Sequence, residues 1–169
     1  MSDSTGRQGT AEVCDMHADR LQVLHTPLRS YGGHKRCSGA IVTVKLNEDN
    51  RTLKAMLQTP GKQRIAVVQT GGVFCAVVGD KLAAHAIENG WAGMIIKGYI
   101  RDARALEQMP MAIWALGTCP RRSAKLEEGE LDASLHFGGV TFETGHYLYA
   151  DEDGIVVAAA PFSDVFFSV

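Results

Sequence analysis

Cysteine is scarce in this chain, and long apolar runs are missing. The four cysteines form no Cys-x-x-Cys unit, and no pair of histidines stands at the spacing of a zinc site. This pattern suits a reducing compartment better than a disulfide scaffold. No apolar run approaches the roughly 20 residues that a membrane span needs, and the polar start of the chain lacks the apolar segment of a signal peptide. We therefore expect a cytoplasmic protein that does not associate with membranes.

Charge of one sign is not concentrated along the chain. The net charge is −2, and acidic and basic residues are interspersed without a basic stripe. Direct nucleic-acid binding through phosphate neutralisation is therefore not expected. The densest basic segment, CPRRSAK (119–125), is predicted to be a solvated surface loop, because short charge runs usually are.

The chain has enough apolar material for one buried core. Its 169 residues are 46% hydrophobic, which is typical of a single globular domain. Runs of β-branched residues alternate with segments that carry apolar residues at helical spacing, and the last third contains only strands and turns. This order predicts an α/β domain with a mixed sheet. The expected strands are 39–46, 64–69, 71–80, 92–100 and 111–117, and the expected helices are 10–19, 50–58, 81–89 and 101–109.

Two of the expected strands carry charged residues directly after their carboxyl ends. The apolar residues 74–78 and 93–98 are joined by one helix, which is typical of a parallel strand–helix–strand unit. Asp80 follows the first strand, and Arg101 with Asp102 follows the second. Ligands bind beyond the carboxyl ends of parallel strands, so we expect these side chains to meet at one edge of the sheet.

These residues supply the parts of a site for a small acidic oxo compound. The free N–H groups of Lys81 and Leu82 at the helix start favour a carboxylate or phosphate, and Arg101 offers a planar fork to an oxygen. Asp102 offers oxygen ligands to a hard divalent cation such as magnesium. The same spacing also fits an ordinary alternative, in which Asp80 caps one helix, Asp102 caps the next, and Arg101 pairs with Asp102 at the surface.

Longer motifs resemble one known family. The stretch GDKLAAHAIENGWAGMIIKGYIRD (79–102) resembles the RraA-like family, which includes the regulator of ribonuclease E activity and the 4-hydroxy-4-methyl-2-oxoglutarate aldolases. This resemblance implies a single α/β domain with a central mixed β-sandwich flanked by helices (αββα, swivelling-domain-like). It also implies a homotrimer, or a hexamer made of two trimers, with the site between subunits. The resemblance covers about residues 10–158 through TAEVCD, YGGHKRCSGAIVTVK, EDN, ALGTCPRRS, FGGVTF and LYADEDGIVV.

The resemblance further implies an activity and the residues that perform it. The aldolases use Mg²⁺ or Mn²⁺ and cleave small 2-oxo acids through a pyruvate enolate, which also allows oxaloacetate decarboxylation. By position, Asp102 corresponds to the metal ligand and Arg101 to the substrate contact that stabilises the enolate. Asp80 is placed to hold a water or to move a proton. The backbone N–H groups that would wrap the substrate carboxylate belong to Gly79, Asp80, Lys81 and Leu82.

The ribonuclease-regulating branch of the family implies an alternative function, that of a non-catalytic protein that binds and inhibits a ribonuclease of the RNase E type. That branch does not keep both the Gly-Asp and the Arg-Asp, whereas this sequence keeps both. Two elements depart from the aldolase pattern, since an Asp-Gly is replaced by Gln69–Thr70 and a Pro-Gly-Asp by Thr144–Gly145–His146. The longer aldolases also take a carboxylate base from a C-terminal extension of a neighbouring subunit, so the base is unidentified here.

The two ends of the chain are expected to differ from the domain between them. We expect a flexible leader over residues 1–9, a domain over 10–160 and a tail over 161–169. Three phenylalanines in the tail would form an exposed apolar patch on a monomer. We therefore expect the tail to dock on the body or on a neighbouring subunit, at a subunit interface.

Overall fold

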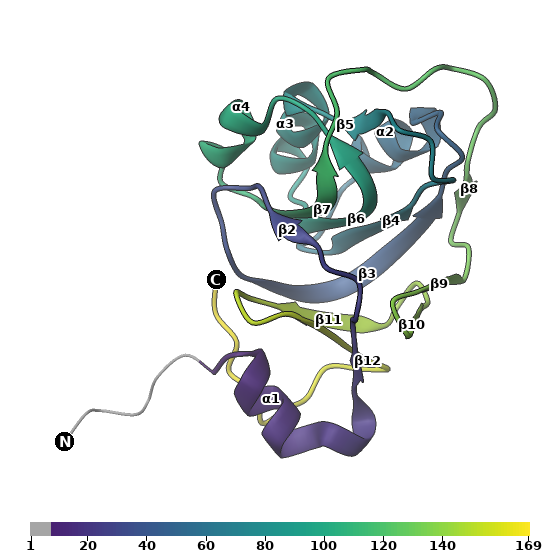
Figure 1. The fold of residues 1–169 in the computed structure, drawn as a ribbon. Helices are drawn as coiled ribbons and strands as arrows, with labels where there is room; N and C mark the ends of the chain where they lie inside the picture. Colours follow the sequence, from purple (N-terminus) through teal and green to yellow (C-terminus); the bar gives the residue numbers. More distant parts are fainter. Residues whose placement is uncertain (1–7) are drawn as a thin grey trace.

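The protein is a mixed α/β domain with one large sheet and few helices (Figure 1). The computed structural model describes residues 8–169, so most of the expected leader lies outside the described part. Within residues 8–169 no helix is long and apolar enough to cross a membrane. The helices are α1 (Thr10–His17), the 3-10 turn η1 (Ala18–Arg20), α2 (Arg51–Leu57), α3 (Asp80–Glu88) and α4 (Ala103–Glu107). The strands are β1 (Gln22–Val23), β2 (Arg29–Ser30), β3 (Cys37–Lys45), β4 (Ile65–Gln69), β5 (Ala76–Val78), β6 (Gly93–Ile100), β7 (Ala112–Thr118), β8 (Glu130–Leu131), β9 (Leu135–Phe137), β10 (Val140–Phe142), β11 (Tyr147–Ala150) and β12 (Ile155–Ala158).

The long strand β3 belongs to two parts of the sheet. Its first residues pair antiparallel with β11, and its second half pairs parallel with β4. The sheet runs in the order β1-β12-β11-β3-β4-β6-β7-β2, while β5 pairs with β6 and β8 pairs with β3. The central strands β3, β4, β6 and β7 are parallel, so their carboxyl ends meet at one edge.

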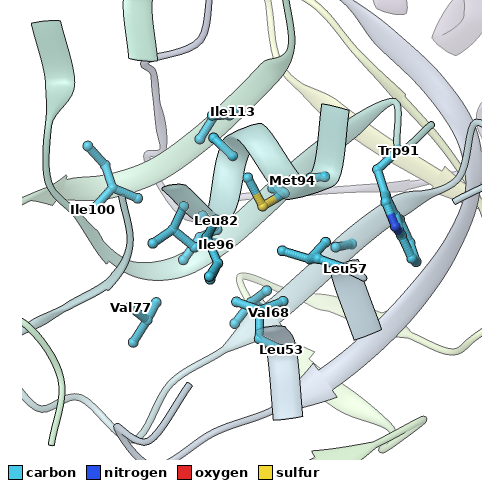
Figure 2. Close-up of a cluster of buried hydrophobic side chains, with 14 of the residues drawn as sticks. Leu53, Leu57, Val68, Val77, Leu82, Trp91, Met94, Ile96, Ile100 and Ile113 are labelled. Carbon is cyan, nitrogen blue, oxygen red and sulfur yellow. The ribbon is translucent and has the colours of Figure 1, made fainter. Parts of the chain in front are cut away.

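Helices cover one face of the parallel strands (Figure 1). Leu53 and Leu57 of α2 and Leu82 of α3 pack on apolar side chains of β4, β6 and β7, such as Ile96 (Figure 2). Burial of each such side chain contributes about 1.5–3 kcal/mol. Because Leu82 lies in the first turn of α3, this core also fixes the start of that helix.

The opposite face of the parallel strands packs on β11, β12 and the β9–β10 hairpin. Ile41, Val67 and Ile95 of the parallel strands share a core with Phe142 and Leu148. The aromatic rings of Phe137 and Phe142 stack within that core at 4.6 Å between centroids. The strands therefore form a two-layer sandwich, and α1 covers its outer side, which confirms the expected layered fold (Figure 1).

The tail packs on the body of its own chain. Phe162 is 6% exposed and stacks on His17 of α1 at 3.9 Å, and its N–H donates to the hydroxyl of Tyr149. Phe166, by contrast, is 76% exposed, but its backbone N–H donates to Oε1 of Gln8 at 2.6 Å. Docking on the body thus occurs within one chain, while the contribution of the tail to a subunit interface stays a prediction.

Most expected elements are present, with two informative errors. The strand expected over 71–80 is limited to β5, because Gly72 has φ +86° and residues 71–75 form a loop. The helix expected over 101–109 begins only at Ala103, because Asp102 adopts a left-handed conformation. The two-residue strands β1, β2 and β8 were not expected, since their pairing depends on distant partners rather than on local pattern.

The buried carboxylate of Asp151 joins the C-terminal strands to α1. Its Oδ2 accepts the backbone N–H of Thr10 at 2.7 Å, and its Oδ1 accepts the Thr10 hydroxyl at 2.6 Å. Oδ1 also accepts the N–H of Asp153 at 3.0 Å. Burial favours the neutral acid, but the hydrogen bonds from Thr10, Asp153 and Gly154 outweigh it and hold the pKa of Asp151 below its usual range.

Replacement of Asp151 by Asn should destabilise the fold by about 2 kcal/mol at neutral pH, because bonds to a charged acceptor are lost. Since the folded-state pKa is lowered, the stabilisation is complete above the ordinary carboxyl pKa of about 4 and disappears as the pH falls through the folded-state value. Urea unfolding between pH 7 and pH 3 measures the free energy of unfolding of wild type and variant. The difference between the two proteins should shrink as the pH falls. Asp153→Asn changes an exposed carboxylate in the same turn and should leave the free energy of unfolding unchanged. A stability difference between wild type and Asp151→Asn that persists in acid would contradict a stabilising role for the ionised Asp151 carboxylate.

Candidate functional site

A pocket of about 960 Å³ lies where β5 and β6 end and α3 begins. It includes every residue that the sequence motifs single out as a candidate. Its lining is rich in charged and polar groups from four separate segments: Asn50, Arg51 and Lys54; Ala76 to Leu82 with His85; Arg101 and Asp102; and Arg121 to Lys125.

Backbone pairing brings the two charged strand ends together. The Arg101 N–H donates to the carbonyl of Val78 at 3.0 Å, which extends the parallel pairing of β5 and β6. The N–H of Asp80 then donates to Oδ2 of Asp102 at 3.2 Å. Residues 22 positions apart therefore meet, as the strand–helix–strand geometry predicts.

The ordinary capping alternative does not describe these residues. Gly79 occupies the N-cap of α3, and Asp80 is already the first helical residue, so Asp80 does not cap a helix that begins at Lys81. Asp102 stands at the N-cap of α4 with φ 60° and ψ 37°, but its side chain makes no capping bond. Asp tolerates the left-handed backbone conformation better than most residues do. In this conformation the carboxylate of Asp102 contacts the N–H of Asp80 and not the N–H groups of α4.

Gly79 allows the close approach of the two strand ends. A Cβ atom at position 79 would lie 2.6 Å from Oδ2 of Asp102 and 3.6 Å from Nε of Arg101. Any side chain there would occupy space beside both groups. A glycine is therefore required for this arrangement because of the missing Cβ, and not because of its backbone angles.

The first turn of α3 presents backbone donors to the pocket. The helical ladder starts with the bond from the Ala83 N–H to the Gly79 carbonyl, at 3.1 Å. The N–H groups of Lys81 and Leu82 precede that ladder, and both residues line the pocket. Together with the helix dipole, they favour an anionic group at this end of α3.

The loop predicted to be ordinary solvated surface belongs to the pocket. Residues 121–125 line it because the chain after β7 runs alongside β5: the Ala76 N–H donates to the Arg121 carbonyl, and the Ser123 N–H donates to the Ala76 carbonyl. The side chains of Arg121 and Arg122 are exposed, as expected, but they face a ligand-sized hollow. Sequence pattern alone could not reveal this pairing across 45 residues.

The positions that depart from the aldolase pattern lie outside the pocket lining. The hydroxyl of Thr70 donates to the carbonyl of Lys97 at 3.0 Å, and its side chain fills the space beside Gly98. His146 precedes β11 and is not part of the lining. His85 is half-buried and lines the pocket.

The donor set can hold a hard divalent cation through few protein ligands. No group of three or more His, Cys, Asp or Glu side chains gathers around a common point within residues 8–169. The carboxylate of Asp102 is exposed, and only its Oδ2 is engaged, by the N–H of Asp80. Magnesium commonly binds in this way, through one or two carboxylates plus water and substrate oxygens, so the residues present fit such an ion.

The fold and the site define the class of protein. It is a single α/β domain with charged groups at the carboxyl ends of its parallel strands, which is where ligands bind in such sheets. The chain belongs to the RraA-like family, whose description is Aldolase/RraA and which matches residues 10–157.

Similar proteins carry different names. A curated relative from Laribacter hongkongensis is 46% identical over 153 residues, 90% of this chain and 96% of the relative, and is named "Putative 4-hydroxy-4-methyl-2-oxoglutarate aldolase". A crystal structure of S-adenosylmethionine:2-dimethylmenaquinone methyltransferase from Geobacillus kaustophilus superposes with a TM-score of 0.89 at 44% identity, over 92% of this chain and 97% of that one. The RNA-processing inhibitor RraA from Thermus thermophilus has a TM-score of 0.89 at 33% identity, over 96% and 99% of the two chains. The aldolase names support a lyase at a coarse level.

Replacement of Gly79 by Ala should displace the carboxylate of Asp102 and leave the Asp80 N–H without its acceptor. Asp102 is exposed and can turn away, so global stability should change by less than about 1 kcal/mol. In NMR exchange experiments, the Asp80 amide should exchange with solvent about tenfold faster than in wild type. Gly117→Ala is the matched control, because its Cβ would only touch ring carbons of Tyr99 at 3.5 Å, and equal Asp80 exchange in all three proteins would contradict the contact.

Proposed function

We propose that the protein is a divalent-metal-dependent lyase that cleaves a carbon–carbon bond of small 2-oxo acids and releases pyruvate. Its substrates would be 4-hydroxy-4-methyl-2-oxoglutarate, cleaved by an aldol reaction, and oxaloacetate, which is decarboxylated. The observation that supports this most is the meeting of Asp102, Arg101 and the α3 amides at one pocket. The relatives named as aldolases support the same class of reaction.

The chain's own groups can bind the common end of these substrates. The N–H groups at the start of α3 would receive the C1 carboxylate, because they are donors at the positive end of the helix dipole. The guanidinium of Arg101 would donate to the keto oxygen at C2. Gly79 leaves room between the two, since it places no Cβ beside Arg101 or Asp102.

Asp102 would hold Mg²⁺ or Mn²⁺, the rest of the coordination coming from water and substrate oxygens. When bound, the metal would supply Lewis-acid polarisation of the keto group. In aldol cleavage the C3–C4 bond breaks, its electron pair forms the enolate of pyruvate, and the C4 hydroxyl gives its proton to the water held by Asp80 as the second carbonyl forms. In decarboxylation the bond to the leaving carbon dioxide breaks, and the same enolate results.

Arg101 and Asp80 would act in the two remaining steps, which are stabilisation of the enolate and proton transfer to C3. Arg101 would stabilise the negative charge that grows on the enolate oxygen, which is the usual function of a fixed cation in such a site. Asp80 and Asp102 are the carboxylates of the pocket lining, and with Asp102 assigned to the metal, Asp80 is the carboxylate that would hold a water and pass a proton to C3. That proton transfer completes pyruvate.

A second candidate is supported by the likeness to the RNA-processing inhibitor from Thermus thermophilus, which extends over 96% of this chain. In that role the protein would bind a ribonuclease of the RNase E type and inhibit it without chemistry of its own. We propose in either case an assembly of three or six copies, as the family resemblance implies.

Release of pyruvate from both substrates should require Mg²⁺ or Mn²⁺ and should stop when a chelator removes the metal. Asp102→Ala and Arg101→Ala should each lower kcat/KM at least about 100-fold, because each removes a fixed electrostatic group from the reacting atoms. A coupled assay that reduces pyruvate with lactate dehydrogenase measures this directly, with corrections for uncatalysed oxaloacetate decay.

Arg104→Ala provides the matched control, since Arg104 is exposed on α4 and lies outside the pocket lining. Its activity should equal that of wild type. If neither substrate is turned over and the protein binds a purified ribonuclease of the RNase E type tightly, the regulator function replaces the lyase.

A further inference from the structure

Two of the four cysteines are brought together beside the pocket, and the proposed function uses neither of them. Cys75 directly precedes β5, and Cys119 directly follows β7. Both are buried, and the Sγ atom of Cys119 donates to the carbonyl oxygen of Phe74 at 3.5 Å. That carbonyl belongs to the peptide group that leads into Cys75, so standard bond lengths place the Cys119 sulfur within about 6 Å of the Cys75 Cα.

Backbone pairing holds the two segments side by side. The Ala76 N–H donates to the Arg121 carbonyl at 2.7 Å, and the Ser123 N–H donates to the Ala76 carbonyl at 3.1 Å. Ala76 and Arg122 are partners in a parallel bridge, so both cysteines enter the paired region from the same end. Paired strands lie about 4.8 Å apart. A disulfide joins Cα atoms that are about 4.4–6.8 Å apart, so neighbouring strands can carry one.

The thiol of Cys75 has a carboxylate beside it. Its Sγ donates to Oε2 of Glu48 at 3.8 Å. Burial is the largest cause that raises the pKa of Cys75, and the charge of Glu48 is the next cause that raises it. Cys75 is therefore a protonated thiol at neutral pH, and Glu48 is placed to accept its proton when the sulfur reacts.

The other two cysteines have different surroundings in the described part of the chain. Cys37 lies in the core between the two layers, where burial raises the pKa of its thiol to about 12. Cys14, on α1, is half-buried, and burial together with Asp15 and Asp151 raises the pKa of its thiol. Their neighbours are apolar side chains and carboxylates rather than a second thiol, so they serve as internal controls.

We propose that Cys75 and Cys119 are a redox-sensitive pair that closes to a disulfide when a peroxide oxidises the protein. Hydrogen peroxide converts the Cys119 thiol to a sulfenic acid and is itself reduced to one water. The Cys75 sulfur then attacks the sulfenic sulfur, and the S–S bond forms as hydroxide leaves. Glu48 takes the Cys75 proton and passes it to that hydroxide, which gives the second water. Because both thiols are buried, the reaction proceeds when the loop opens locally.

The disulfide would tie the loop of residues 119–125 to β5. In the reduced protein this loop is held by its pairing with Ala76 and by Lys125, whose ammonium group donates to Oδ1 of Asn50. Residues of the loop and of β5 both line the pocket, so the bond would restrict the motion of one pocket wall. Redox-sensing disulfides of this kind are transient in a reducing compartment.

Mass spectrometry of the full chain after treatment with hydrogen peroxide tests the pair. Digestion without a reductant should yield one linked peptide that contains Cys75 and Cys119, and dithiothreitol should separate it again. Cys75→Ala should prevent the bond and leave Cys119 as a sulfenic acid that dimedone labels. Cys119→Ala should prevent both the bond and the label, because the thiol that reacts first is missing.

Limited digestion with trypsin tests the effect on the loop, because Arg121 and Arg122 are exposed cleavage sites within it. Oxidised wild type should be cut there about tenfold more slowly than reduced wild type, since cleavage needs local opening of the loop. In Cys119→Ala the oxidant should leave the cleavage rate unchanged. Cys14→Ala is the matched control and should behave as wild type in both experiments, because Cys14 lies on α1.

The outcomes decide the inference without any 2-oxo acid, so they are independent of the proposed lyase. The linked peptide together with slower cleavage supports the redox-sensitive pair. Thiols that stay reduced in folded wild type, or a bond that forms between other cysteines or between two molecules, would overturn it. If the linked peptide forms and trypsin cuts both forms at equal rates, the pair is supported as a site of oxidation and the restriction of the loop is overturned.

Discussion

The arrangement of the molecule depends on the double pairing of β3. One strand pairs antiparallel with β11 through its first residues and parallel with β4 through the rest, so it joins both layers of the sandwich. Its buried side chains contribute to the core on both faces of the parallel strands. The chain that leaves β3 then carries Asn50, which donates to the carbonyl of Val77 in β5 and accepts the ammonium group of Lys125 from the loop after β7. The segment that follows this strand thus contributes Asn50, Arg51 and Lys54 to the pocket lining.

The pocket combines two kinds of constraint. Close packing fixes the Gly79–Asp102 side, where a missing Cβ lets a carboxylate reach a backbone N–H. Hydrogen bonds to neutral or buried partners fix the cationic side, where Asn50 and Asp49 hold long side chains that would otherwise sample many rotamers. The names of similar proteins point to an aldolase, a methyltransferase and an RNA-processing inhibitor. Since the fold is common to all three, the groups in the pocket decide the function.

The sequence allowed the layered α/β fold to be predicted because apolar periodicity is local, and it allowed Asp80, Arg101 and Asp102 to be placed at one edge because strand–helix–strand geometry is regular. Three features could not be predicted in this way. The left-handed backbone of Asp102 occurs together with a contact to Asp80, 22 residues away. The inclusion of residues 121–125 depends on pairing with Ala76. The positioning of Lys125 by Asn50 joins residues 75 positions apart, which no local pattern encodes.

The bonds between Gln8 and Phe166 place the two ends of the described chain side by side, because the Phe166 N–H donates to the Gln8 side chain and the Gln8 N–H to the Phe166 carbonyl. Residues 8–166 of the chain therefore nearly close on themselves. A short peptide linking the ends would cost little loop-closure entropy. The chain can then be reopened at an exposed loop, and this circular permutation would present the same pocket in a new order of segments.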